Sequence, residues 1–139
     1  MDPFPNYSVL LNEKLVVPSS TTQYVAIDQH FFYQLMRDFI SKIYVDVPWY
    51  IGSNPDIEEA IANGLSAKDH YCRFGYFEHR MPYAIKVEEE WYLDAYPDIK
   101  EAVEQRAFPS GQSHFDVIGY REGRIPAPGF SLRTELTDD

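Results

Sequence analysis

The feature that most constrains the fold of this chain is an internal repeat. The stretch WYIGSNPDIEEAI, residues 49–61, aligns without gaps with WYLDAYPDIKEAV, residues 91–103, at an offset of 42 residues. After an insertion of two residues the match resumes at an offset of 44, where HYCRFGYFEHRMP (70–82) pairs with HFDVIGYREGRIP (114–126). A match of this length predicts one supersecondary unit that is used twice, each copy covering the apolar face of the other.

Each copy is predicted to form short helices in series. In copy one, an N-cap at Asn54 predicts a helix over about 55–63, and a capping-box pattern at Ser66 predicts a second helix that stops at a glycine. The matching helices of copy two are expected over about 97–106 and 112–118. Apolar residues at helical spacing form one core stripe in each copy: Ile57, Ala60 and Ile61, and Ile99, Ala102 and Val103.

Residues kept in both copies are expected to serve the architecture, because two identical reaction sites in so short a chain would be unusual. We expect each kept histidine to pack inside its copy and to hydrogen-bond a loop carbonyl; metal binding is disfavoured, since no second ligand recurs at a repeated spacing. The Glu-x-Arg pairs predict a salt-bridged turn. The alternative is that they form a polar edge that binds a partner. The tryptophans are expected in the core, where the first helix docks. These residues are Trp49, Trp91, His70, His114, Gly75, Gly119, Glu78, Glu122, Arg80 and Arg124.

The repeat also disfavours catalysis. Cys72 in copy one is matched by Asp116 in copy two, so the apparent cluster of reactive residues does not recur. The chain has no P-loop, no dinucleotide-binding glycine motif, no nucleophile elbow, no HExxH and no CxxC. The acidic run VEEEWY (87–92) is typical of the first turn of a helix. We therefore expect no enzyme activity, no catalytic residue, no cofactor and no bound metal, with a small hydrolase built on His70 and Cys72 as a further alternative.

The first 45 residues differ in character from the repeat. Residues 7–15 and 21–28 are rich in aliphatic and β-branched side chains on either side of the turn-like VVPSS, which predicts a β hairpin. Asp28 then caps an amphipathic helix over about 29–44. Its apolar face is either intrachain core or the interface of a homodimer, because an isolated hairpin needs further cover. This predicted interaction face comprises Phe32, Leu35, Met36, Phe39, Ile40 and Ile43.

Composition and charge limit the classes of function. The chain has 139 residues, one domain's worth, and is 45% hydrophobic and 16% aromatic, which is too apolar for a disordered chain. With 12 basic and 22 acidic residues its net charge is −10, so a nucleic acid or an anionic membrane would repel most of its surface. No apolar run approaches the ~20 residues of a membrane helix. A single cysteine and the absence of a secretory pattern at MDPFPNYSV predict a cytoplasmic protein.

The repeat also resembles a known sequence pattern. The pattern WYLxxYPDIxxAV, followed by HFxxxGYxEGRxP, resembles a short repeat of bacterial proteins that are linked to surface polysaccharides and often appended to glycosyltransferases. The resemblance covers about residues 46–126, and copy one departs from it at His79, where copy two has a glycine. It implies an accessory or appended module of bacterial origin, and it transfers no active site.

The predicted organisation is a mainly α fold. A β hairpin and an amphipathic helix (1–45) precede helical repeat 1 (46–86) and helical repeat 2 (87–126), and an extended acidic tail (127–139) follows. The leading hypothesis is a non-catalytic protein-interaction or scaffold module, an accessory subunit of a bacterial assembly, with surface-polysaccharide synthesis as the setting and a glycosyltransferase as the candidate partner. The alternative is a carbohydrate-binding module that stacks sugars on exposed Trp49, Tyr50, Trp91 and Tyr92.

Overall fold

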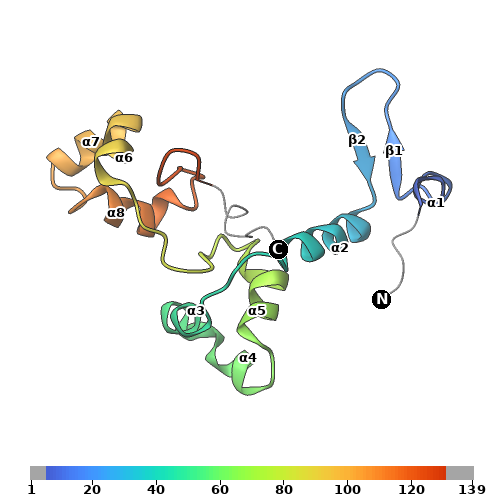
Figure 1. The fold of residues 1–139 in the computed structure, drawn as a ribbon, viewed down its shortest axis with the longest axis horizontal. Helices are drawn as coiled ribbons and strands as arrows, with labels where there is room; N and C mark the ends of the chain where they lie inside the picture. The colour runs from blue at the N-terminus through green and yellow to red at the C-terminus, as the bar shows by residue number, and fades with distance from the viewer. Residues whose placement is uncertain (1–5, 131–139) are drawn as a thin grey trace. The chain divides into compact units, whose positions relative to one another are not determined.

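The chain folds mainly into short helices with one small hairpin, which confirms the predicted fold class. The structure, a computed structural model, describes residues 6–130, so most of the predicted acidic tail lies outside the described residues. The chain divides into unit 1 (1–39) and unit 2 (40–139), which are taken separately below (Figure 1). The elements are α1 (Tyr7–Asn12), β1 (Val16–Pro18), β2 (Val25–Ile27), α2 (Gln29–Ile40), α3 (Val47–Ser53), η1 (Pro55–Ile57), α4 (Glu58–Ala62), α5 (Ala67–His70), η2 (Tyr71–Gly75), α6 (Glu89–Ala95), α7 (Pro97–Glu104), α8 (Gly111–His114) and η3 (Phe115–Gly119).

Unit 1 begins with a helix where a strand is predicted. Residues 7–15 are expected to form the first strand, but Tyr7–Asn12 forms α1, and this prediction is wrong. Asn6 caps the helix, because its side-chain oxygen accepts a hydrogen bond from the Val9 amide at 3.1 Å. Leu10 is the buried residue of the helix. The aliphatic content of the segment suggests a strand, whereas the cap and the helical spacing of its apolar residues favour the helix.

The hairpin starts later in the chain than predicted. Strand β1 lies in the stretch VVPSS, which is expected to form the turn, and β2 lies within the second predicted strand. The two strands pair antiparallel, with Val17 opposite Ala26. None of the six strand residues is buried. The hairpin therefore adds no buried core of its own.

Helix α2 begins where the sequence predicts and ends earlier. The side chain of Asp28 caps it, accepting a hydrogen bond from the Phe31 amide at 2.9 Å. The helix ends at Ile40, several residues before the predicted end. The chain then turns, and the Ile43 amide donates a hydrogen bond to the Ile40 carbonyl at 2.9 Å.

The predicted interaction face is divided between buried and exposed positions. Ile40 and Ile43 are buried and belong to unit 2. Phe32 and Phe39 are 40% and 39% exposed, and the two members between them are partly buried. The six residues therefore do not form one exposed surface, because the helix ends at Ile40 and Ile43 packs beyond it.

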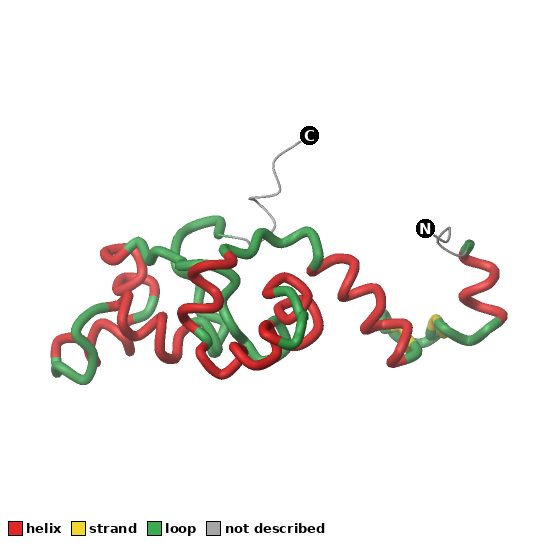
Figure 2. Tube along the Cα trace, turned by 90° about the horizontal axis from the view of Figure 1, so that it is seen from below, coloured by secondary structure: helices red, strands yellow, loops and turns green. Residues whose placement is uncertain are grey.

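In unit 2 the two copies of the sequence repeat have the same order of elements. Each starts with a seven-residue helix, α3 or α6, and each ends with a short α-helix that continues into a five-residue π-helix, η2 or η3. The predicted helix over 55–63 is divided into the 3-10 turn η1 and α4, whereas α7 is continuous. Figure 2 shows strands only in the hairpin, with helices and loops in the rest of the described chain.

In each copy one backbone hydrogen bond joins a residue near its start to a proline near its end. The Asp46 amide donates to the Pro82 carbonyl at 3.0 Å, and the Glu88 amide donates to the Pro126 carbonyl at 2.9 Å. Both prolines are fully buried. One core cluster combines Ile85, from the end of repeat 1, with Val87, Tyr92, Ile99 and Phe115 of repeat 2.

The longest helix in the part of the chain that the structure describes is α2, with 12 residues. Within residues 6–130, no helix has the length and apolar character that crossing a membrane requires.

Candidate functional site

The kept histidines are held by the tyrosines of the Trp-Tyr pairs. His70 and His114 are buried, and their Nδ1 atoms lie 2.9 Å and 3.0 Å from the hydroxyl oxygens of Tyr50 and Tyr92. The predicted loop-carbonyl partner is therefore wrong. Both tyrosines are fully buried, and a hydroxyl in the interior needs a partner there. Burial raises the pKa of Tyr50 to about 12, and burial, helped by the positive Arg80, lowers the pKa of His70 below its usual value.

The glycines that end η2 and η3 leave room for these hydroxyls. A Cβ atom at Gly119 would lie 2.5 Å from the Tyr92 hydroxyl oxygen and 3.2 Å from His114 Nδ1. A Cβ atom at Gly75 would overlap the Tyr50 hydroxyl in the same way. Glycine is needed at both positions because the tyrosine approaches the backbone closely.

The Trp-Tyr pairs divide their roles in a way that the sequence does not predict. Tyr50 and Tyr92 are fully buried, whereas Trp49 and Trp91 are only partly buried. The tyrosines are therefore excluded as sugar-stacking platforms, because no part of either ring is exposed. Of these four residues, only the tryptophans keep part of their surface exposed.

The Glu-x-Arg pairs form salt-bridged turns, as the sequence predicts. Arg80 Nε lies 2.6 Å from Glu78 Oε2, and Arg124 Nε lies 3.1 Å from Glu122 Oε2. Each arginine also binds an aspartate in the other half of its copy: Asp56 accepts two bonds from Arg80, at 2.7 and 2.9 Å, and Asp98 accepts from Arg124 at 2.7 and 3.4 Å. The hydrogen bond from Arg80 lowers the pKa of Asp56. The sequence does not single out these two aspartates as partners of the arginines, although both stand in the kept Pro-Asp-Ile.

Cys72 is buried, and it lacks the features of a nucleophile. Burial raises the pKa of its thiol, which disfavours the reactive thiolate. Within residues 6–130, no group of three His, Cys, Asp or Glu side chains is placed to hold a metal ion.

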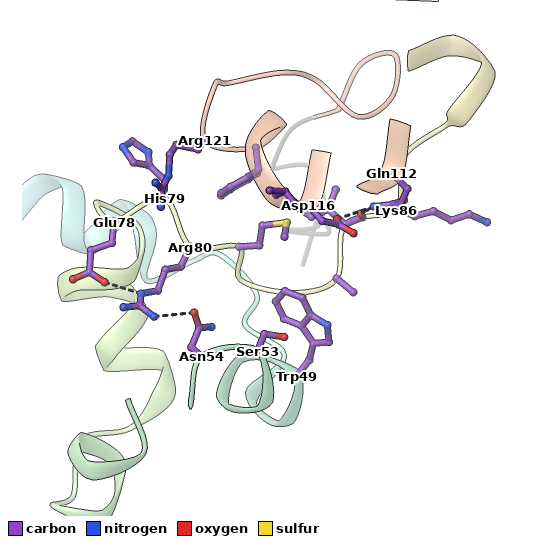
Figure 3. Close-up of a pocket in the computed structure, with 15 residues that line it drawn as sticks. Trp49, Ser53, Asn54, Glu78, His79, Arg80, Lys86, Gln112, Asp116 and Arg121 are labelled. Atoms are coloured by element: carbon purple, nitrogen blue, oxygen red, sulfur yellow. Dashed lines mark hydrogen bonds and ion pairs between the residues drawn. The ribbon is translucent and has the colours of Figure 1, made fainter. Parts of the chain in front are cut away.

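A cleft of about 860 Å³ lies in unit 2, and both copies line it. Figure 3 shows Trp49 from α3 on one side of the cleft and Gln112 and Asp116 on the other side. Lys86, from the segment that joins the two copies, and Arg121, from the turn after η3, also line it. The volume is within the range of ligand pockets in proteins.

Two amide side chains build the walls of the cleft. Asn54 donates to the Tyr50 carbonyl at 2.7 Å and accepts from Arg80 at 2.9 Å. Gln112 donates to the Ile85 carbonyl at 3.0 Å and accepts from the Val87 amide at 2.7 Å, and thus fixes the segment that joins the copies. The hydrogen-bonding groups of both amides are therefore used within the fold.

The charged groups of the cleft differ in how far they are paired. Arg80 is held by two carboxylates, and Asp116 accepts one hydrogen bond, at 2.8 Å, from Gln112. Lys86 and Arg121 make no ion pair with any residue that the structure describes. The cleft therefore combines a partly buried indole with polar groups that have unused hydrogen-bonding capacity.

Comparison of the chain with protein-family models, with curated proteins and with solved structures found no match.

Proposed function

We propose that this protein is a non-catalytic interaction module, an accessory or scaffold subunit of a bacterial assembly. The proposal includes a link to surface-polysaccharide synthesis with a glycosyltransferase as partner, which rests on the resemblance of the repeat. It also includes a cytoplasmic location, which rests on the single cysteine. The observation that carries the proposal is the uneven distribution of exposed apolar side chains. Of the sixteen large hydrophobic residues that are exposed in the described chain, ten lie in unit 1: Tyr7, Val9, Leu11, Val17, Tyr24, Val25, Ile27, Phe32, Tyr33 and Phe39.

Unit 1 is too small to bury these side chains itself. Among residues 6–39, only Leu10 and Phe31 are buried apolar residues. Domains below about 40 residues usually need a disulfide, a metal or association with another chain for stability. The only cysteine of the chain is in unit 2, so a disulfide within unit 1 is excluded. Association with a protein surface would cover the exposed side chains of this unit.

The distribution of charge supports association through unit 1. Residues 1–39 contain two basic and four acidic residues, whereas residues 40–139 contain ten basic and eighteen acidic residues. Unit 1 therefore carries a net charge of −2 and unit 2 one of −8, so two copies that meet through unit 1 bring less like charge together than two that meet through unit 2. A homodimer through unit 1 is therefore the first partner to test, and a different protein is the second.

Light scattering of purified protein tests this proposal. We expect a mass of about twice the chain's 16.2 kDa at micromolar concentration, lowered by Val25→Lys in unit 1 and unchanged by Val47→Lys in unit 2. The two valines are 54% and 44% exposed, so they form a matched pair. A monomer that still binds the dye ANS through unit 1 would rule out the homodimer and leave a different protein as the partner. A monomer without ANS binding would contradict the proposal.

A carbohydrate-binding module is the second candidate, and one observation favours it. Trp49 keeps exposed ring surface inside a cleft, next to polar side chains with unused hydrogen-bonding capacity. The burial of Tyr50 and Tyr92 restricts any sugar stacking to the tryptophans. Exposure of the indole to quenching by acrylamide, with and without glycan, tests this candidate.

A further inference from the structure

We infer that the cleft between the two copies is a carbohydrate site in which an uncharged sugar ring stacks on Trp49 and its hydroxyls bind Asp116 and Arg121. The inference rests on the second candidate function and makes it specific, because it names the platform, the polar partners and the class of ligand.

The first argument is a difference between the two tryptophans. In copy two, the Tyr96 ring packs edge-on against Trp91, with ring centroids 6.5 Å apart, and the guanidinium of Arg124 lies 4.7 Å from the centre of the Tyr96 ring. In copy one, Asn54 stands at the position of Tyr96. No aromatic ring of the described chain covers Trp49 as Tyr96 covers Trp91. Both indoles are partly buried, but they differ in their aromatic neighbours, and Trp49 is the one that lines the cleft.

The second argument comes from the opposite wall of the cleft. Asp116 and Arg121 line the cleft, and their counterparts in copy one are Cys72 and Phe77, neither of which is charged at neutral pH. Asp116 lies in η3 (Phe115–Gly119), and Arg121 lies five residues later in the turn that follows. This polar pair thus occurs in one copy only and is not required by the shared architecture.

The third argument concerns hydrogen-bonding capacity. One carboxylate oxygen of Asp116 accepts a bond from Gln112, and its other oxygen has no partner among the described residues. The guanidinium of Arg121 is likewise unpaired within residues 6–130. A carboxylate accepts hydrogen bonds and a guanidinium donates them, so together they match the hydroxyls of one sugar edge. The apolar C–H face of the same ring then lies on the indole.

Charge distinguishes a neutral sugar from an acidic ligand. Unit 2 carries eighteen acidic and ten basic residues, whereas the cleft itself is lined by two acidic side chains, Glu78 and Asp116, and three basic ones, Arg80, Lys86 and Arg121. The net charge of the unit repels a polyanion, and a charged ligand of either sign would meet like charges in the cleft itself. An uncharged ligand rich in hydroxyls has no such cost.

The test is a glycan array that spans neutral and acidic hexopyranose glycans, followed by calorimetry with the best-bound oligosaccharide. We expect binding to neutral glycans, weakened at least about tenfold by Trp49→Ala and about tenfold by Asp116→Ala, the size expected for loss of one stacking or charged hydrogen-bond contact. The matched control is Asp94→Ala, since the Asp94 side chain is 75% exposed and its residue does not line the cleft. The affinity of Asp94→Ala for the oligosaccharide should equal that of the unmodified protein.

A second readout avoids dependence on the folding of the variants. The chain has two tryptophans, so Trp91→Phe leaves Trp49 as the only indole, and its emission should shift when the glycan binds. Binding that survives Trp49→Ala and Asp116→Ala would overturn the assignment to this cleft and leave carbohydrate binding elsewhere in the protein. Preferential binding of acidic glycans would overturn the neutral ligand class. A blank array would overturn both the inference and the carbohydrate-binding function, and would leave the protein-interaction proposal untouched.

Discussion

The substitution Gly119→Ala tests whether glycine is kept because a buried tyrosine hydroxyl approaches the backbone. The added Cβ atom would lie 2.5 Å from the Tyr92 hydroxyl oxygen and 3.2 Å from His114 Nδ1, and the Tyr92 ring is fully buried. Neither ring can move without disturbing its neighbours, because the Tyr92 ring packs against Phe115 at 6.0 Å between centroids. The hydroxyl must therefore shift and lose its hydrogen bond to His114.

The expected cost combines two effects. Overpacking of a core by one methyl group costs about 1–3 kcal/mol, and a buried polar group left without its partner costs about 1–3 kcal/mol. Replacing a helical glycine by alanine recovers about 0.5–1 kcal/mol of backbone entropy. We expect Gly119→Ala to lower the free energy of unfolding by about 2–4 kcal/mol. At Gly52 in α3 no atom lies within 4 Å of the added Cβ, so Gly52→Ala is expected to be neutral or stabilising.

A double-mutant cycle measured by urea unfolding identifies the clashing atom. Tyr92→Phe removes the hydroxyl and is expected to cost about 1–2 kcal/mol, because His114 loses its partner. In the double variant the methyl group takes the space of the hydroxyl, so its stability should fall within about 1 kcal/mol of Tyr92→Phe alone. Additive effects of the two substitutions, or equal effects of Gly119→Ala and Gly52→Ala, would refute the reasoning.

Two further predictions concern Arg80 and His70. Arg80→Lys should lower the free energy of unfolding by about 1–2 kcal/mol, because lysine cannot bind Asp56 bidentately and also reach Asn54. The control Lys100→Gln should change the free energy of unfolding by less than about 0.5 kcal/mol. Equal effects of the two substitutions would contradict this prediction. The Lys100–Asp94 pair is a single 3.3 Å contact between largely exposed side chains. The pKa of His70 is lowered in the folded state, so the folded protein favours the neutral imidazole. The resulting stability is fully present above about pH 6.5, the usual pKa of histidine, and is lost as the pH falls toward the lowered pKa of the folded state. Urea unfolding at pH 7.5 and 5.5 should show this loss, reduced in His70→Asn, and an unchanged loss in that variant would exclude His70 as its cause.

The sequence alone predicts the helical class and the short helices of the repeat. Ser66 caps its helix as predicted, accepting a hydrogen bond from the Asp69 amide at 3.0 Å, because caps are local signals that are read within a few residues. The predicted cap at Asn54 is wrong, since its side chain makes no capping bond and contacts the Tyr50 carbonyl and Arg80 instead. The salt-bridged turn at Glu78 and Arg80 is local as well, since the two residues are two positions apart. Local signals failed at Tyr7–Asn12, where aliphatic content suggested a strand and a single cap at Asn6 favoured a helix.

Tertiary structure decides the contacts that join residues far apart in the chain. Tyr50 meets His70 across 20 residues, and Arg80 meets Asp56 across 24, distances at which spacing in the sequence carries no geometric information. Identity between the copies shows that these residues matter to the architecture, but only their packing shows which pairs form. The cleft is the extreme case, because Trp49 and Asp116 belong to different copies and meet around one space only after both copies have folded.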